Sequence, residues 1–427
     1  MVAVFLCQTG LQALLSPIKT ATWTTGTTRV RARGLLTLTA ELNPYAKTKF
    51  AILGGGAFSL ALAQVLSYKN ISTSLLVRRQ DVADQINTNR FHPKYLSDCR
   101  LPDSLWATSD PVKALEGANF VVHAVPMQES RAFLEKVREH LPKDAPVLSV
   151  TKGVEQNTFC LMNDIILETL GTTRRAAFLS GPSFAREIMR GEATAVVIAS
   201  TDDSLSSELS EILSGVEFRC HTSRDVKGVE LGGAIKNVIA LAAGMCEGLG
   251  LGMNAMSSLV TRGCMEMARC VSLFESFFSV LGPPSHFLPS PLSLFFSLSS
   301  LSLRPNRMGA LFGADEETFF GLAGVGDTFG TCLGPLSRNR QVGIRLAKGE
   351  RLEEILKSID GVSEGVFTAL ALEQLIKTKV RPTVFDFKFP IISGVASIIK
   401  GTITPEFGLT LLMKYPVRDE NRGNRRL

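Results

Sequence analysis

Short apolar runs of strand length alternate with segments of helical period between residues 49 and 200. The segment Phe58–Tyr68 places its apolar residues at helical spacing. Five other runs are short and rich in apolar residues: Phe50–Leu53, Thr73–Val77, Phe120–Val125, Pro146–Val150 and Ala193–Ala199. Strands that bracket helices at this spacing predict a parallel sheet with right-handed crossover connections.

From Val226 onward the pattern changes to long helical periods with few clusters of β-branched residues. We therefore expect an all-helical second domain that begins near residue 225. The predicted organisation is an α/β domain over 48–225, a helical domain over 226–416 and a solvated tail over 417–427.

One segment of the helical half, residues 271–307, follows neither period. It is a mixture of Ser, Leu, Phe and Pro with almost no charge. Three interpretations compete: a membrane-associated hairpin, a loop that binds a partner, or translated non-coding sequence. Its prolines and serines interrupt any apolar stretch of about 20 residues, so no integral membrane span is expected. The third interpretation is favoured, since pyrimidine-rich tracts encode this composition, and it predicts disorder or poor packing.

The first 47 residues are rich in Thr, Ala, Leu and Arg, and Glu41 is their single acid. This composition is typical of an organelle transit peptide and lacks the sustained apolar core of a secretory signal. A disordered extension is the alternative. We expect a plastid as the destination, with a mitochondrion or the cytoplasm as alternatives.

Composition narrows the class of protein. Hydrophobic residues make up 45% of the 427 residues and charged residues 20%, which is typical of a globular enzyme. Much of the net charge of +6 lies at the two ends, and no basic face interleaved with aromatics predicts nucleic-acid binding. The eight cysteines and five histidines show no metal-ligand spacing, so we expect no metal and favour a reducing compartment. His123 is the histidine closest to a functional position, although a structural role is favoured for it.

A glycine-rich turn, Gly54–Ser59, follows the first predicted strand. It departs from the pattern G-x-G-x-x-G only at its last position, Ser59. Glycines let the backbone approach a pyrophosphate, whose charge is favoured at the N-terminus of the following helix. Strand, turn and helix together predict a Rossmann-like, doubly wound parallel sheet that binds a dinucleotide. Arg78 and Arg79 follow the second strand, where an acid usually binds the ribose 2′-hydroxyl. Arginine there favours tolerance of a 2′-phosphate, and two surface arginines are the alternative.

Lys236 is the strongest candidate for catalysis. It lies in a predicted helix whose apolar residues recur at positions 235, 238, 239 and 242, directly beyond Gly232 and Gly233. A lysine beside such a packed face loses water, and desolvation lowers its pKa. Lys236 is therefore expected to exchange protons near neutral pH.

Other polar positions lie where ligands are expected. Lys152 directly follows one predicted strand and Ser180–Ala185 follows another, and ligands of open α/β sheets bind outside the carboxyl ends of strands. In the helical half, Gly324–Asp327 and Ser337–Arg340 are polar islands between apolar stretches. Arginine binds phosphate oxygens bidentately, and asparagine can orient a hydroxyl. Each island alone is also typical of a turn or a surface cap.

These motifs, in this order, resemble the bacterial and plastid-type NAD(P)-dependent glycerol-3-phosphate dehydrogenases. The most specific stretches are Ser180–Glu187, Gly228–Ala240, Leu322–Asp327 and Ser337–Arg340. The resemblance implies a Rossmann-like sheet followed by an all-α domain, with NAD or NADP as the cofactor. It also implies glycerol 3-phosphate and dihydroxyacetone phosphate as substrates, a role in glycerolipid precursor supply, and a homodimer.

The resemblance further implies roles for matching residues, with Lys236 as the acid/base. The residues implied to surround glycerol 3-phosphate are Lys152, Gly181, Ser183, Lys236, Asp327, Ser337, Arg338 and Asn339. Those implied to line the dinucleotide site are Gly54, Gly56, Ala57, Phe58, Arg79, Lys152, Ala185, Arg338, Val362 and Glu364. Two departures, Ala57 in place of a frequent serine and Ser59 in place of glycine, predict weaker dinucleotide binding or a shifted phosphate.

The implied reaction is a reversible hydride transfer between NAD(P)H and dihydroxyacetone phosphate. Lys236 protonates the forming alkoxide while Arg338 and Asn339 anchor the phosphate. Two alternatives stay open. One is a related dehydrogenase of a hydroxyacid such as 6-phosphogluconate or of a 3-hydroxyacyl thioester, although the Ser-Arg-Asn anchor argues against it. The other is a catalytically impaired dinucleotide-binding protein, motivated by 271–307. Both NADH and NADPH, and both directions, are compatible with these residues.

Overall fold

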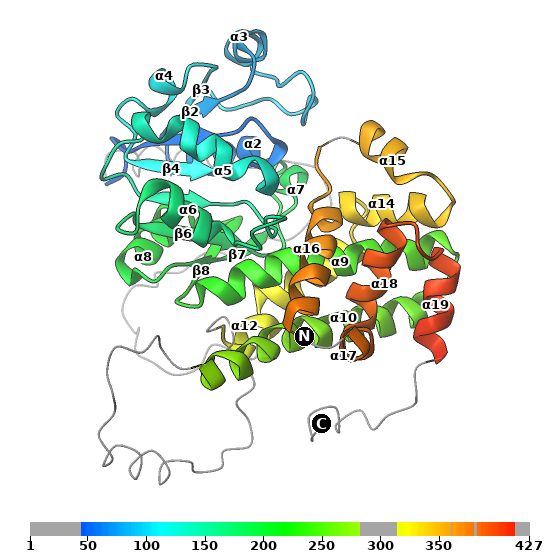
Figure 1. Cartoon of the computed structure of the whole chain (residues 1–427). Helices are drawn as coiled ribbons and strands as arrows, with labels where there is room; N and C mark the ends of the chain where they lie inside the picture. The colour runs from blue at the N-terminus through cyan, green and yellow to red at the C-terminus, as the bar shows by residue number, and fades with distance from the viewer. Residues whose placement is uncertain (1–43, 282–313, 360, 380–381, 415–427) are drawn as a thin grey trace, which may run out of the picture. The chain divides into compact units, whose positions relative to one another are not determined.

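The computed structural model describes residues 44–281, 314–359, 361–379 and 382–414 (Figure 1). Its N-terminal part is an eight-stranded sheet with helices on both faces. The strands are β1 (Lys49–Leu53), β2 (Ser72–Leu76), β3 (Leu105–Thr108), β4 (Phe120–His123), β5 (Val147–Ser149), β6 (Ala176–Ser180), β7 (Thr194–Ala199) and β8 (Phe218–Ser223). The helices are α2 (Ala57–Ser67), α3 (Gln80–Asn89), α4 (Pro111–Leu115), α5 (Met127–Val137), η2 (Arg138–His140), α6 (Met162–Leu170), α7 (Ala185–Met189) and α8 (Asp203–Leu213).

The strand order is β3-β2-β1-β4-β5-β6-β7-β8. It runs in one direction along the sheet from β1 to β3 and in the other from β1 to β8, so β1 and β4 flank the point where the order reverses. In open α/β sheets, ligands bind in the crevice outside the carboxyl ends of the strands at this point. The doubly wound fold predicted from the sequence is confirmed.

Both faces of the sheet are buried, which explains the continuous apolar runs of its strands. Phe50 and Ile52 of β1 belong to one hydrophobic core with α2. Ala51 and Leu53, which point to the opposite face, belong to a second core with α5 and α6.

The prediction of a wholly parallel sheet is wrong at one pair. β6 and β7 are antiparallel, with Leu179 opposite Ile198, whereas the other neighbours are parallel. A parallel return needs a connection that carries the chain back along the sheet, usually on a full helix. The connection from β6 to β7 holds only the five-residue α7, so the chain re-enters the sheet from the edge at which β6 ended.

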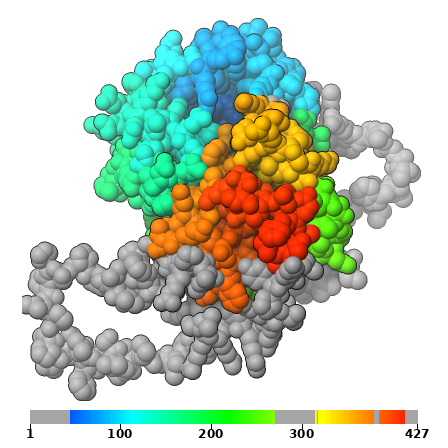
Figure 2. All heavy atoms as spheres, turned by 45° about the vertical axis from the view of Figure 1, so that its right-hand side comes forward, coloured from blue at the N-terminus to red at the C-terminus, as the bar shows by residue number. Residues whose placement is uncertain are grey.

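The C-terminal part is helical. Its elements are α9 (Val226–Gly248), α10 (Met253–Leu281), α12 (Glu316–Phe320), the π-helical turn η3 (Leu322–Gly326), α13 (Asp327–Leu333), α14 (Arg338–Ala347), α15 (Leu352–Ser358), α16 (Glu364–Lys379), α17 (Pro382–Lys388), α18 (Pro390–Ile399) and α19 (Pro405–Lys414). α9 contacts α10, α13, α14, α16 and α18 and is the central element (Figure 1). Figure 2 shows α16, α18 and α19, in orange to red, together on one face of this part.

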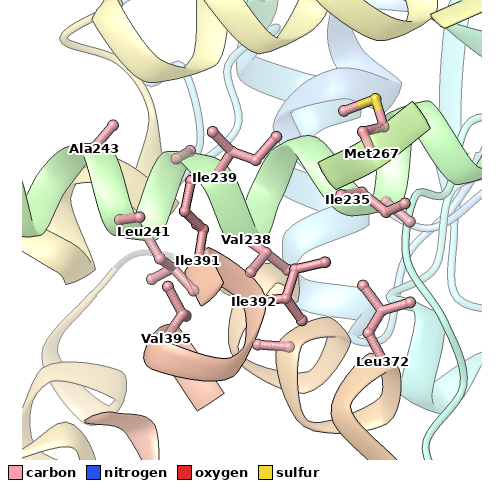
Figure 3. Close-up of a cluster of buried hydrophobic side chains, with 14 of the residues drawn as sticks. Ile235, Val238, Ile239, Leu241, Ala243, Met267, Leu372, Ile391, Ile392 and Val395 are labelled. Carbon is pink, nitrogen blue, oxygen red and sulfur yellow. The ribbon is translucent and has the colours of Figure 1, made fainter. Parts of the chain in front are cut away.

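The packing around α9 explains why this helix is apolar on nearly every side. Figure 3 shows Ile235 and Val238 of α9 among side chains of the neighbouring helices, including Leu372 of α16 and Ile392 of α18. α9 is also long and apolar enough to cross a membrane, but its apolar window of 18 residues is wholly buried within the described structure, as in the core helix of a globular protein.

The segment 271–307 was predicted to lack regular structure, and this is wrong for its first residues. α10 continues to Leu281. No glycine or proline occurs between 271 and 281, and the first helix-breaking residues come at 282–284, Gly-Pro-Pro. Three predicted segments lie outside the described residues. They are the rest of 271–307, the predicted transit peptide 1–47 except its last four residues, and the tail 417–427.

Candidate active site

The glycine-rich turn adopts a backbone that the glycines make possible. Gly54 has a φ of +110°, and a Cβ there would lie 2.7 Å from the carbonyl oxygen of Ala124. A Cβ at Gly55 would lie 2.7 Å from Val77. At Gly56, by contrast, a Cβ would meet nothing within 4 Å. Gly56 is the N-cap of α2 and has no side-chain cap, so this open space faces a helix N-terminus suited to a phosphate. The turn therefore fits a dinucleotide pyrophosphate.

The next residues of α2 occupy different surroundings. Ala57 and Phe58 are partly exposed in its first turn. Ser59 is buried at 1% exposure, and its hydroxyl has no hydrogen-bond partner. The expected weakening of dinucleotide binding by Ala57 and Ser59 stays a prediction.

Lys236 lies on the buried side of α9 with 7% exposure. Its Nζ donates to Asp327 Oδ1 at 2.6 Å and to Thr331 Oγ1 at 2.9 Å, both on α13. The other oxygen of Asp327 accepts from Lys152 Nζ, also at 2.6 Å. Lys152 follows β5, so one carboxylate joins a lysine of the sheet to a lysine of the helical part. Two ammonium groups and one carboxylate leave a local excess of one positive charge, which suits an anionic substrate.

The pKa values of these groups follow from burial and from one another. The pKa of Lys236 is lowered to about 8: burial is the largest cause, Asp327 opposes the shift, and Lys152 adds to it. Burial alone would raise the pKa of Asp327, but the two ammonium groups outweigh it and hold that pKa below its usual value. Near neutral pH, Lys236 can therefore both give and accept a proton.

Gly232 and Gly233 explain how this lysine reaches the site. A Cβ at Gly232 would lie 2.7 Å from the carbonyl oxygen of Ala323 in η3, and one at Gly233 would lie 2.8 Å from Ser180 Oγ. The pair lets α9 pack closely against both η3 and the end of β6. The room that Gly232 and Gly233 leave is used by the backbone of η3 and by the side chains of Ser180 and Lys152.

The loop after β6 borders the same cluster. The carbonyl oxygen of Gly181 accepts from Lys152 Nζ at 3.3 Å and from Ser183 Oγ at 2.9 Å. Gly181 has a φ of +134°, and a Cβ would lie 2.9 Å from the backbone of Val196 in β7. Ala185 then begins α7, which packs against α2. Lys152, Gly181 and Ser183 are therefore together, as the resemblance implies.

The Ser-Arg-Asn island begins α14. Ser337 is its N-cap and accepts from Arg340 N at 3.2 Å. Asn339 is buried and donates to Asn237 Oδ1 at 2.9 Å, so the island is tied to the residue that follows Lys236. Its own Oδ1 accepts from Ser363 Oγ at 2.7 Å. The expectation that Asn339 orients a ligand stays a prediction, since its carbonyl oxygen already holds the start of α16.

Glu364 links α16 to the sheet. Its Oε1 accepts from the backbone N–H of Met127 at 2.9 Å, at the start of α5 beyond the carboxyl end of β4. Burial raises the pKa of Glu364 to about 7, although Met127 and Arg338 oppose the shift. Val362 lies two residues earlier, and a Cβ at Gly361 would collide with the Arg338 guanidinium. Val362, Glu364 and Arg338 are thus neighbours, on the side of the helical part that meets the sheet.

Arg79 is the N-cap of α3, after β2. His123 ends β4 but is fully buried, with its Nε2 2.9 Å from Ser130 Oγ. Burial lowers the pKa of His123 to about 3, so the ring is neutral and structural, as favoured. Among the described residues, no group of three or more His, Cys, Asp and Glu could hold a metal ion.

Two partners in this cluster were missed from the sequence. Thr331 follows Asp327 by four residues, which places both on one face of a helix, and this spacing was a usable signal. Asn237 is the neighbour of Lys236, but its bond to Asn339 joins residues 102 apart and leaves no local signal.

Comparisons with known proteins agree with this geometry. The family model described as NAD-dependent glycerol-3-phosphate dehydrogenase N-terminus matches residues 49–206. The corresponding C-terminus model matches residues 225–283 and 304–409. It leaves residues 284–303, within the segment singled out by composition, unmatched.

Relatives and solved structures span most of the chain. It is 38% identical over 375 residues to a chloroplastic NAD(+) glycerol-3-phosphate dehydrogenase of Oryza sativa subsp. japonica, covering 87% of this chain and 75% of the rice protein. It is 37% identical over 373 residues to the NAD(P)+ glycerol-3-phosphate dehydrogenase of Solidesulfovibrio magneticus, covering 87% of this chain and 100% of that one. A crystal structure of glycerol-3-phosphate dehydrogenase from Coxiella burnetii matches with a TM-score of 0.73 and 29% identity, covering 86% and 99% of the two chains. With turn, lysine pair and family models in agreement, this chain belongs to the NAD-dependent glycerol-3-phosphate dehydrogenase family.

Proposed function

We propose that the protein catalyses the reversible reduction of dihydroxyacetone phosphate to sn-glycerol 3-phosphate with NAD(P)H. The observation that carries the proposal is the buried Lys236, held by the carboxylate it shares with Lys152 at hydrogen-bond distance. A ketone reduction needs a proton donor beside the carbonyl oxygen and positive charge for a phosphate, and this cluster offers both.

The dinucleotide, when bound, supplies the hydride. The open space at Gly56 and the N-terminus of α2 would take its pyrophosphate, with Ala57 and Phe58 in the adjoining turn. Val362 and Glu364 would border it from the helical part, and Ala185 from the sheet. These residues bind and orient, and the closely packed β6 and α9 exclude water from the lysine side.

The chain's own chemistry is proton transfer and charge. In reduction, the Lys236 ammonium would donate its proton to the ketone oxygen, and in oxidation the neutral amine would take it back. Asp327 would hold Lys236 and Lys152 in place, with Gly181 and Ser183 beside Lys152. Ser337, Arg338 and Asn339 would form the phosphate end, so that binding of the phosphate orients the reacting carbon.

An assay of the full chain tests the proposal directly. NADH or NADPH oxidation would be followed with dihydroxyacetone phosphate. In the reverse direction, reduction of NAD or NADP would be followed separately with glycerol 3-phosphate, 6-phosphogluconate and a 3-hydroxyacyl thioester. We expect turnover with dihydroxyacetone phosphate and with glycerol 3-phosphate in reverse. Turnover only with another hydroxy compound, or none with either phosphate, would reject the function.

The stretch that the family model leaves unmatched motivates a second candidate, a dinucleotide-binding protein whose activity is impaired by residues 284–303. The full chain and a variant lacking 284–303 would be assayed side by side. Activity that appears only after the deletion supports impairment. Equal activity of the two supports a working enzyme with a tolerated insertion.

We also propose domain boundaries, a plastid location and a homodimeric assembly for this protein. Residues 48–225 would form the dinucleotide-binding domain and 226–416 the substrate domain, with 1–47 a plastid transit peptide and 417–427 a tail. The chloroplastic rice and Arabidopsis thaliana relatives support the destination. Fusing 1–47 to a fluorescent protein tests the targeting. Light scattering tests a homodimer against the 46.2 kDa monomer.

A further inference from the structure

The two arginines after β2 lie where doubly wound folds bind the adenosine ribose. Each of them already forms an ion pair with a carboxylate. A Cβ at Gly55 would lie 2.7 Å from Val77, so the glycine-rich turn lies directly beside the residue before Arg78. The ribose of a dinucleotide lies at the end of this second strand in doubly wound folds. Arg78 and Arg79 therefore follow, by one and two residues, the residue that the turn approaches.

Arg79 is engaged by Asp81 through two bonds. Its Nε donates to Asp81 Oδ1 at 2.8 Å, and its Nη2 donates to Asp81 Oδ2. This fork occupies the donor edge with which an arginine would otherwise grip a phosphate. The arginine lowers the pKa of Asp81 below its usual value, so the carboxylate is charged at neutral pH.

Arg78 has a partner from a different element. Its Nη2 donates to Glu129 Oε2 in the first turn of α5. All four side chains keep at least half of their surface exposed, so the pairs can open. Two arginines and two carboxylates leave no net charge where a 2′-phosphate would need positive charge.

We infer that Asp81 and Glu129 set the dinucleotide selectivity of this site and favour NAD over NADP. A 2′-phosphate must displace a carboxylate from each arginine or lie beside that carboxylate, and like charges repel. A ribose 2′-hydroxyl carries no charge and can donate to a carboxylate. Asp81 and Glu129 thus take the place of the acid that usually follows the second strand. Asp81 comes two positions after Arg79, and Glu129 comes some fifty positions after Arg78. The inference rests on the proposed function and specifies NAD, rather than NADP, as its preferred cofactor.

Selectivity is tested by equilibrium binding, without turnover. Full-length protein would be titrated calorimetrically with AMP and with adenosine 2′,5′-bisphosphate, which differ only in the 2′-phosphate, and fluorimetrically with NADH and NADPH. We expect the unchanged protein to bind NADH more tightly than NADPH. Asp81→Asn and Glu129→Gln should each tighten NADPH binding by about three- to tenfold, as expected for one removed charge near the surface, and change NADH binding by less than about twofold.

The matched control is Asp203→Asn. Asp203 also lies in the first turn of a helix and pairs with an exposed arginine, Arg224, at 3.2 Å. It should leave the NADPH to NADH ratio unchanged, and thermal melting of each variant separates binding effects from loss of fold. An unchanged ratio in the double variant Asp81→Asn/Glu129→Gln, or a preference of the unchanged protein for NADPH, overturns the inference.

The outcomes also separate the inference from the proposed function. If the protein reduces dihydroxyacetone phosphate but the ratio does not move, only the selectivity of Asp81 and Glu129 is refuted. If it binds neither dinucleotide, both fail together.

Discussion

The dinucleotide half and the substrate half of the site differ in the groups that they offer to a ligand. On the proposed dinucleotide side, the backbone forms the surface offered to a ligand: Gly54 and Gly55 allow the turn, and Gly56 leaves open space at a helix N-terminus. On the substrate side, buried charged side chains dominate, with Lys236 at 7% and Asp327 at 2% exposure. At the end of β2, on the dinucleotide side, side-chain charge is exposed and locally cancelled, as at Arg79 and Asp81.

The difference follows from what each half must do. A pyrophosphate is held tightly enough by backbone N–H groups and a helix N-terminus, which need no titratable group. A proton must instead be moved on the substrate side, and an amine with an ordinary pKa would hold it too firmly at neutral pH. Burial lowers the pKa of Lys236 to about 8, and this requires a packed core rather than a surface turn. Substitutions on the substrate side should therefore impair proton transfer, and those on the dinucleotide side should impair dinucleotide binding.

The largest effect is expected for Lys236→Met. Loss of the proton donor should lower kcat for dihydroxyacetone phosphate by about 100- to 10,000-fold, the usual contribution of general acid catalysis. NADH binding should change little, because the turn around Gly56 is untouched. Steady-state kinetics and fluorescence titration of NADH measure the two quantities.

Lys227→Met is its control, since Lys227 lies on the same helix but is exposed. It should retain the kcat of the unchanged protein. An unaltered kcat in Lys236→Met would remove the lysine from the mechanism and end the contrast between the halves.

Asp327→Asn should come next. The buried Lys236 and the partly buried Lys152 would lose their shared anion, and removing one partner of a buried ion pair typically costs about 3–5 kcal/mol of unfolding free energy. Asp327 also raises the pKa of Lys236. In the variant the pH at which reduction of dihydroxyacetone phosphate declines should therefore move to lower values. Denaturant melts and pH–rate profiles measure both.

Asp103→Asn removes an exposed carboxylate paired with Arg100 and should alter neither quantity. If the pH profile of Asp327→Asn instead coincides with that of the unchanged protein, Asp327 does not tune the lysine.

The sequence predicted the two halves unequally well. β1, the turn and α2 are local, so apolar runs and glycines predicted them together, and the period of α9 predicted Lys236 on a packed helix. The resemblance implied that Asp327 lies beside the substrate with Lys152 and Lys236. That both lysines share its carboxylate was not predictable, because Asp327 lies 175 residues from Lys152 and 91 from Lys236. The direction of β7 was missed for a related reason. Its pattern is the same in either direction, and only the length of the connection from β6 distinguishes them.

A pair of glycine substitutions should separate fold from binding on the dinucleotide side. Gly54→Ala forces a side chain into positive φ and against the Ala124 carbonyl, which should lower the unfolding free energy by about 1–3 kcal/mol. Gly56→Ala meets open space at a φ of −76° and should leave the melting temperature unchanged. It should still weaken NADH binding by about tenfold, the size of one lost hydrogen bond to a charged group.

In neither variant should the pH dependence of the remaining activity move, since Lys236 is untouched. Normal NADH binding by Gly56→Ala would show that the pyrophosphate lies elsewhere.

The last effect concerns the pH dependence of stability alone, at a buried carboxylate without the two ammonium partners that Asp327 has. Glu266 on α10 is 1% exposed and accepts from the backbone N–H of Ile391 at 2.9 Å, at the start of α18. Burial raises its pKa from 4.5 to about 8 despite these bonds and the nearby Arg262 and Arg269. Between these values the folded protein holds a proton that the unfolded chain has lost. This contribution to stability is therefore complete below about pH 4.5 and is lost as the pH rises through about 8.

Glu266→Gln should flatten that dependence by up to about 1.4 kcal/mol per pH unit, as measured by denaturant melts between pH 5 and pH 8. The exposed Glu353→Gln should leave the slope as it is. If Glu266→Gln leaves it unchanged as well, burial alone does not raise a carboxyl pKa in this helical part. The low pKa of Asp327 would then need no explanation from its two lysines, and the chemical contrast between the halves of the site would lose its physical basis.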